Sequence, residues 1–149
     1  MNLNFEWSKP LKLSEAEGAI YRIELSRVPT GPGIYVFGRK YDGKYEALYV
    51  GKATEIRPRV KTQLNNLKLM RHVEDAKSGD RVLLTALFRP RPGHPTEKSL
   101  LLMERALIRL FLAEGHDLVN RQGTSLRQHE ITSSKRPAWL VPKKIFLEK

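Results

Sequence analysis

Four polar side chains whose phenol and cationic groups could take part in proton transfer or anion binding lie within residues 33–59, namely Tyr35, Tyr49, Lys52 and Arg59. The guanidinium group of Arg59 is planar and permanently charged, so it could hold two oxygens of a phosphate group at once. Arg59 also fits a second account, in which it only covers the edge of a helix's apolar face. The first account predicts a phosphate-binding site, and spacing alone leaves both accounts open.

A single carboxylate, Glu104, occupies the apolar face of a predicted helix, four residues after Leu100 and four before Ile108. An ionised carboxylate in such a place is costly unless a cation or hydrogen-bond donors meet it. One possible partner is a buried arginine. The other is a divalent metal ion whose remaining ligands are water and phosphate oxygens. Periodicity alone does not choose between these partners.

Two apolar, aromatic runs carry the tyrosines, at residues 33–37 and 47–51. The polar link between them contains Asp42-Gly43, so the runs are predicted to form a β-hairpin whose connection is longer than a tight turn. A third strand, apolar enough to be central, is predicted at 81–88. The predicted fold is therefore α/β (α+β), with a small, mainly three-stranded antiparallel central sheet flanked by helices.

Three helices are predicted around this sheet. The first begins at Glu55, is capped by Thr54 and runs to about Leu67. A short polar helix follows at 69–80. The longest runs from Thr96 to about Glu114, with Gly115 as its C-terminal cap.

The chain divides into three predicted parts. Residues 1–28 form an extension that packs on the core, with a strand at 21–25 and a helical turn capped by Ser14 and Glu17. Residues 29–124 form the main domain. Residues 125–149 form a basic tail, which could dock Trp139 and Phe146 on the domain or bind DNA by charge and stacking.

Positive charge is concentrated after the first thirty residues. The chain has 27 Lys and Arg against 16 Asp and Glu, a net charge of +11, whereas residues 1–30 carry equal numbers of each sign. Such a surplus favours nucleic acid, because it neutralises phosphates and releases their counterions. A basic protein kept soluble by its charge, or attracted to anionic lipid, is the alternative. The residues expected to contact a nucleic-acid backbone are Lys52, Arg57, Lys61, Arg89, Arg91, Lys143 and Lys144.

Several classes of protein are not supported by the sequence. Without cysteine, disulfides, thiolate-bound zinc and thiol chemistry are excluded. No apolar run is long enough to span a bilayer, and the first residues lack the pattern of a signal peptide. We therefore expect a cytoplasmic protein with no membrane partner.

The order of the polar residues resembles that of the GIY-YIG nuclease family, whose two name-giving tripeptides read here as Gly33-Ile34-Tyr35 and Tyr49-Val50-Gly51. The resemblance extends to Lys52-Ala53 and to Arg59, eight residues past Gly51, and it covers about residues 29–120. It implies a metal-dependent endonuclease that hydrolyses DNA. A DNA-repair role, a mobile-element role and a restriction role all fit this implication.

The resemblance also implies a role for each site residue. Glu104 would hold one Mg²⁺ or Mn²⁺, and Arg59 would contact the phosphate. Tyr49 would act as general base or orient the attacking water, with Lys52 close enough to assist by its charge. Tyr35 would order the water. Asn120 resembles the asparagine that closes the family motif and would order the site by hydrogen bonding, although it could equally be only a turn residue.

One position departs from the family pattern. Gln63 stands where family members usually place a tyrosine or histidine, and glutamine can position water but is not a useful base. A second hypothesis is therefore a catalytically weak or inactive nucleic-acid-binding module on the same fold. A third is a basic RNA-binding protein in which the two tripeptides are accidental.

Overall fold

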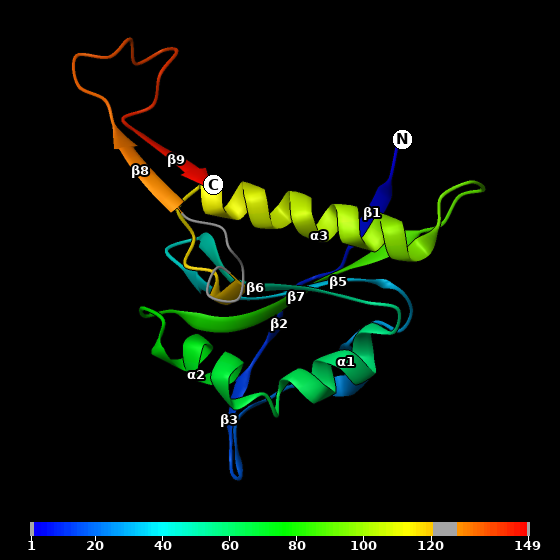
Figure 1. Ribbon diagram of the computed structural model, residues 1–149. Coiled ribbons are helices and arrows are strands. Elements are labelled where there is room, and N and C mark those ends of the chain that lie inside the picture. Colours follow the sequence, from blue (N-terminus) through cyan, green and yellow to red (C-terminus); the bar gives the residue numbers. More distant parts are fainter. Residues whose placement is uncertain (1, 121–127, 149) are drawn as a thin grey trace.

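A five-stranded antiparallel sheet is the central element of the computed structural model, which describes residues 2–120 and 128–148 (Figure 1). Its long strands are β5 (Gly33–Tyr41), β6 (Lys44–Ala53) and β7 (Asp80–Arg89), with β5 between the other two. Two short strands, β1 (Asn4–Trp7) and β2 (Leu11–Lys12), pair with β7, so β6 is an edge strand. The predicted fold class, with three main strands, is confirmed.

The hairpin of β5 and β6 is tighter than the sequence suggested. It turns at Asp42 and Gly43, whose φ angles of 48° and 72° are those that an Asp-Gly hairpin turn requires. The longer link predicted from the polar residues is wrong, because these residues continue both strands. Within that link Arg39 is buried, and its Nε donates to Glu46 Oε1 at 2.6 Å on the paired strand.

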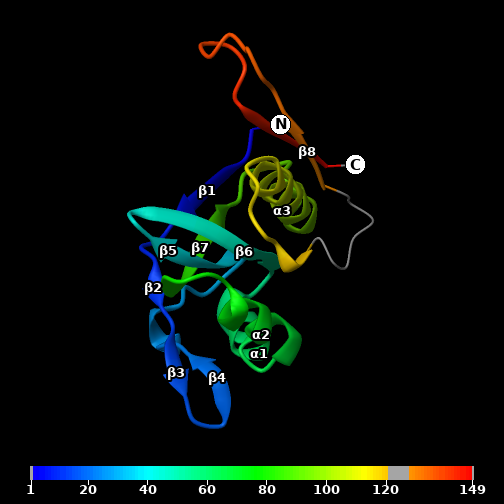
Figure 2. The ribbon, with the colours of Figure 1, turned by 90° about the vertical axis from the view of Figure 1, so that its left-hand side faces the viewer.

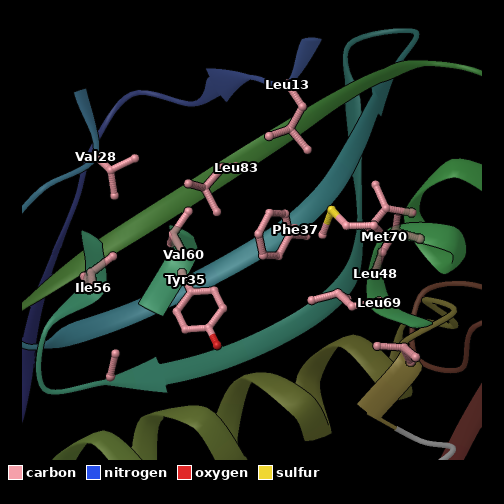
Figure 3. Close-up of a cluster of buried hydrophobic side chains, with 13 residues drawn as sticks. Leu13, Val28, Tyr35, Phe37, Leu48, Ile56, Val60, Leu69, Met70 and Leu83 are labelled. Atoms are coloured by element: carbon pink, nitrogen blue, oxygen red, sulfur yellow. The ribbon is translucent and has the colours of Figure 1, made fainter. Parts of the chain in front are cut away.

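Helices cover both faces of the sheet, as Figure 2 shows. The helices α1 (Ile56–Gln63) and α2 (Leu67–Asp75) lie on one face, and α3 (Thr96–Ala113) lies on the other. Neighbouring residues of β5 therefore enter different cores. Tyr35 and Phe37 pack with α1 and α2 (Figure 3), whereas Ile34 and Val36 pack against α3.

The segment after β6 differs from its prediction at both ends. Thr54 does not cap α1, because Glu55 is the N-cap residue and its carboxylate accepts a hydrogen bond from the Gly31 N–H at 3.2 Å. The helix ends at Gln63 instead of continuing to Leu67, which is 54% exposed and outside the core.

A second helix then begins, because Asn66 caps α2 by accepting a hydrogen bond from the Leu69 N–H at 3.2 Å. The predicted polar helix at 69–80 thus starts and ends earlier. It is also amphipathic, with Leu69, Met70 and Val73 buried in the core.

The third predicted strand and the longest predicted helix are confirmed as β7 and α3. Gly115 ends α3 with a φ of 85°, and its N–H donates to the Leu112 carbonyl at 3.1 Å. This is the left-handed cap that glycine favours. No helix within the described ranges is long and apolar enough to cross a membrane.

The N-terminal segment contains a hairpin where a helical turn was predicted. The strands β3 (Ser14–Ala16) and β4 (Ala19–Arg22) pair across a turn in which Gly18 has a φ of 76°. The strand predicted at 21–25 therefore ends at Arg22, and a 3-10 helix, η1 (Leu25–Arg27), follows it. The capping pair predicted at Ser14 and Glu17 is wrong.

The C-terminal segment forms a separate hairpin of β8 (Gln128–Thr132) and β9 (Lys144–Glu148). It lies beside the C-terminal end of α3, and its tip points away from the central sheet (Figures 1 and 2). The turn predicted at 121–123 and the side chain of Phe146 lie outside the described part of the chain.

Candidate phosphodiester site at the edge of β6

The two tyrosines of the predicted site meet over β6. Their ring centroids are 5.9 Å apart, Tyr35 is only 1% exposed and Tyr49 is half-buried. Tyr35 lies directly opposite Gly51, and its hydroxyl points toward β6 in Figure 3. A Cβ atom at Gly51 would collide with the Tyr35 ring and hydroxyl. Glycine at this position therefore allows the buried ring to cross the strand.

The glycine of the first tripeptide has a comparable steric role. A Cβ atom at Gly33 would collide with the backbone carbonyl of Ala86 on the neighbouring strand β7 and with the Ile56 side chain. Gly33 thus permits close approach between β5, β7 and the start of α1. Packing therefore explains both glycines of the two tripeptides. The tyrosines are the residues of the tripeptides whose side chains could take part in chemistry.

Gln63 connects the two tyrosine hydroxyls. Its Nε2 donates to the Tyr35 hydroxyl at 2.8 Å and to the Tyr49 hydroxyl at 3.4 Å. The Gln63 Oε1 in turn accepts from Asn66 Nδ2 at 3.1 Å. Because Asn66 also caps α2, the turn between α1 and α2 fixes the orientation of the amide. The sequence placed Gln63 near the site, but it gave no indication of the contact with Asn66.

Burial raises the pKa of Tyr35 well above the ordinary tyrosine value of 10.0. The hydrogen bond from Gln63 and the positive charge of Arg59 lower this pKa, and the neighbouring Tyr49 raises it further. The raising effects dominate. Tyr35 therefore keeps its proton at neutral pH, so it can donate a hydrogen bond but cannot serve as a base.

Side chains that follow α3 cover the outer edge of β6. Asn120 Oδ1 accepts a hydrogen bond from the Val50 N–H at 2.9 Å, and its Nδ2 donates to the Val50 carbonyl at 2.9 Å. His116 Nδ1 accepts from the Ala47 N–H at 2.9 Å. These bonds occupy backbone groups that an edge strand otherwise leaves unpaired. Asn120 thereby holds the middle residue of the second tripeptide in place.

Glu104 is half-buried and contacts the same edge of β6 at Lys52, two residues after Val50. The backbone N–H of Lys52 hydrogen-bonds to its carboxylate. Burial raises the pKa of Glu104 above its ordinary value of 4.5, while the charges of Lys52 and Arg105 and this backbone hydrogen bond oppose the shift. Within residues 2–120 and 128–148, no salt bridge joins Glu104 to a base. The arginine partner considered from the sequence is therefore not found in this part of the chain.

Lys52 and Arg59 line the same open hollow, which has a volume of about 510 Å³ and lies between β6, α1 and α3. Neither side chain forms a salt bridge or hydrogen bond with another residue of the described ranges. Glu97 and Lys98 from the first turn of α3 also line this hollow. Glu97 was not predicted from the sequence to belong to the site. Its spacing of seven residues from Glu104, which places both on one helix face, was the available signal.

Comparisons of the chain with protein-family models, curated proteins and solved structures found no match. The GIY-YIG resemblance therefore depends on the order of the residues in the sequence. In the described part of the chain, no three His, Asp or Glu side chains gather into a metal-binding cluster. A single carboxylate completed by water and phosphate oxygens is the arrangement that these residues fit.

The other basic residues that were predicted to contact a nucleic-acid backbone fall into two groups. Three of these bases already have partners. Arg57 donates to the Val28 carbonyl at 2.8 Å and the Ser26 carbonyl at 3.1 Å, Arg89 pairs with Glu6, and Lys144 lies 2.8 Å from Glu130. The remaining three side chains are exposed and have no salt bridge within the described ranges; they are Lys61, Arg91 and Lys143.

Proposed function

We propose that this chain hydrolyses DNA phosphodiester bonds at the edge of β6, with a GIY-YIG-type site that uses one Mg²⁺ or Mn²⁺. The observation that carries the proposal is the hollow lined by Lys52 and Arg59, whose side chains form no salt bridge or hydrogen bond with a described residue, next to the half-buried Glu104, which is bonded to the Lys52 backbone. The tyrosine pair joined by Gln63 belongs to the same sheet edge but is not among the residues that line this hollow. Packing explains both glycines, and edge pairing explains Asn120. Neither explains why Lys52 and Arg59 point into one open hollow.

Lys52 and Arg59 bind the phosphate group in this mechanism. The Arg59 guanidinium can hold two phosphate oxygens in its planar fork, and the Lys52 ammonium adds a compact charge. Because both cations line the hollow, they would meet the negative charge that develops on the phosphoryl group during hydrolysis.

Tyr49 orients the attacking water. Its oxygen already accepts hydrogen bonds from Gln63 Nε2 and from the Tyr35 hydroxyl, so its own O–H is the group that can hold the water. Tyr35 remains protonated and packs against Tyr49, so it fixes the second phenol and supplies a hydrogen-bond donor. The two tyrosines therefore have different roles despite their similar positions in the two tripeptides.

Glu104 would hold the metal ion, because its carboxylate is half-buried and has no salt bridge to a described base. Bound there, a divalent cation would stabilise the negative charge on the leaving oxygen. The hydrogen bond from the Lys52 backbone fixes Glu104 beside the phosphate-binding hollow.

The direct test is nicking of supercoiled plasmid in the presence of Mg²⁺. We expect cleavage by the wild type and a loss of at least about 100-fold in rate for Glu104→Gln. Glu17→Gln, an exposed carboxylate in the turn between β3 and β4 without a salt bridge to a described residue, is the control and should cleave like the wild type. Equal cleavage by Glu104→Gln and the wild type would contradict the proposal.

A non-catalytic nucleic-acid-binding module is the second candidate, and the contacts of Gln63 favour it. Its amide occupies both tyrosine hydroxyls, and an amide cannot take a proton from water. The variant Gln63→His is informative if the wild type binds DNA but cuts no intact, branched or damaged substrate. It then distinguishes a weakened nuclease from a protein without nuclease activity. Appearance of cleavage in this variant supports a weakened nuclease, and continued inactivity supports the binding module.

A further inference from the structure

The tip of the β8–β9 hairpin, residues 133–143, presents two large apolar side chains to solvent. Trp139 is 85% exposed and Leu140 is 67% exposed. Trp139 therefore does not dock on the domain, which was one of the two alternatives that the sequence left open. Exposed tryptophan next to exposed leucine is unusual for a surface loop, and it marks an interaction site.

Internal hydrogen bonds hold the tip in one conformation. The N–H groups of Leu140 and Val141 both donate to the Pro137 carbonyl, at 2.9 and 2.8 Å. The Arg136 guanidinium donates to the Val141 carbonyl at 3.0 Å, so it closes the loop from the other side. The loop thus displays Trp139 on a fixed backbone, which lowers the entropy lost when it binds a partner.

The charge of the tip indicates the kind of partner. Residues 133–143 contain three bases, Lys135, Arg136 and Lys143, and no acid. Lys135 and Lys143 are exposed and have no salt bridge to a residue of the described ranges. A flat aromatic group between positive charges matches a polyanion that also offers flat apolar surfaces, and the bases of nucleic acid provide them.

We propose that this tip binds unpaired or unstacked nucleic-acid bases, with Trp139 stacked on a base and Leu140 beside it, while Lys135 and Lys143 contact phosphates. An anionic membrane is the weaker alternative. Two side chains supply less apolar area than a single acyl chain, and even that chain gives only marginal membrane binding. The choice of DNA as the natural ligand rests on the proposed function, whereas the binding of bases does not.

The position of the tip indicates a class of DNA substrate. It lies beyond the C-terminal end of α3 (Figure 1), whereas Glu97 and Glu104 lie in the first half of that helix. The 18 residues of α3 span about 27 Å. A DNA molecule that contacts both places would need unpaired bases some distance from the cleaved bond. Flap and bubble structures meet this requirement, and a continuous duplex does not.

Tryptophan fluorescence tests the stacking directly, because the chain has only two tryptophans. Trp7→Phe leaves Trp139 as the single reporter, and titration with a dT oligonucleotide in EDTA avoids cleavage. We expect saturable quenching of Trp139, since stacking on a base quenches indole emission. Absence of quenching at oligonucleotide concentrations that saturate binding would overturn the proposal. Emission changes with anionic vesicles but not with the oligonucleotide would replace it with membrane binding.

Binding measurements in the otherwise wild-type chain provide a second test. Trp139→Ala should weaken binding to a labelled bubble duplex by about 5- to 100-fold, the value of stacking on one base, and should change binding to a paired duplex much less. Trp139→Phe should retain part of the affinity. Equal affinity of Trp139→Ala and the wild type for the bubble would reject the stacking role.

The two proposals fail separately. If Trp139 is quenched but plasmid is never nicked, the tip binds bases and the nuclease proposal fails. If Trp139→Ala binds and cuts every substrate like the wild type, the nuclease proposal survives and the tip proposal fails.

Discussion

Glu104 occupies a place that is unfavourable for folding and suitable for chemistry. Its carboxylate is half-buried, and only the Lys52 backbone and nearby positive charge compensate for the lost hydration. A residue kept for structure alone would be better replaced by a neutral amide of the same shape, which keeps the hydrogen bond without the charge. The stability of such a variant therefore reports whether Glu104 is a structural residue.

Glu104→Gln should raise the melting temperature near neutral pH while it abolishes the proposed cleavage. Burial raises the folded-state pKa above the ordinary value of 4.5, so the folded state is favoured below that pH and loses stability as pH rises through the folded pKa. The advantage of glutamine should consequently disappear at about pH 4, where both side chains are neutral. Thermal unfolding at the two pH values measures this. A lower melting temperature near neutral pH would assign Glu104 a structural role.

Gly51→Ala should destabilise the fold by about 1–3 kcal/mol, the usual cost of overpacking a core. The added methyl group would collide with the Tyr35 ring, which is buried and held by Gln63, so the ring has no free space to enter. Urea unfolding measures the loss. In a Tyr35→Leu background the same substitution should cost clearly less, because its collision partner is gone. Equal costs in both backgrounds would show that the strand, and not the ring, requires glycine.

At the scale of elements, the candidate site depends on how the edge of β6 is closed. A bulge shifts the register between Phe37 and Gly38, so Ala47 and Val50 both point their N–H groups outward. His116 and Asn120 bind these groups from the segment that follows α3. This segment therefore protects the edge strand and fixes the backbone that carries Tyr49 and Lys52.

His116 should make stability depend on pH. Burial lowers its pKa below the ordinary value of 6.5, although the charges of Glu114 and Glu46 oppose the shift. The unfolded chain binds the proton more tightly, so the stabilisation is present above about pH 6.5 and is lost as pH falls through the folded pKa. His116→Asn keeps an acceptor for the Ala47 N–H without titrating. Between about pH 7.5 and about pH 5, the urea midpoint of the wild type should fall more than that of this variant. If the difference between the two proteins is the same at both pH values, His116 does not cause the pH dependence.

The elements that the sequence predicted correctly are those whose own residues determine them. The apolar run of β7, the long amphipathic α3 and its Gly115 cap needed no tertiary information. The break between α1 and α2 was missed, because its cause is the side chain of Asn66, which serves both as a helix cap and as a partner of Gln63. The local pattern gave Leu67 to the first helix, and only packing shows that it is exposed.

The site residues likewise include some that the local sequence predicts and others that depend on tertiary contacts. Tyr35, Tyr49, Lys52 and Arg59 could be named from their order, since two strands and a helix start are short-range features. Glu97 shares a helix face with Glu104, but that it lines the hollow with Lys52 and Arg59 depends on tertiary packing, which helical spacing does not give. The hydrogen bonds that Asn120 makes to the Val50 backbone depend on a contact seventy positions apart, which no local pattern encodes.

For the whole molecule, net charge is a poor guide to which bases bind a polyanion. The surplus of +11 counts Arg57 and Arg89 equally with Lys61 and Arg91. Arg57 is bound to two backbone carbonyls of the N-terminal segment, and Arg89 is paired with Glu6. Moving either onto a phosphate would break contacts within the protein. If the chain binds DNA as proposed, the bases without such contacts should account for the salt dependence of that binding.

Lys61→Ala and Arg57→Ala provide a matched comparison, because both remove one positive charge from α1. Each phosphate that a base neutralises adds about −0.9 to the slope of log affinity against log salt concentration. Lys61→Ala should reduce the magnitude of this slope by about one, if its free ammonium group contacts a phosphate. Arg57→Ala should leave the slope nearly unchanged but lower the melting temperature, since it releases the Val28 and Ser26 carbonyls. Anisotropy titrations of a labelled duplex at several salt concentrations measure both slopes, and equal changes would show that net charge, not the free bases, governs binding.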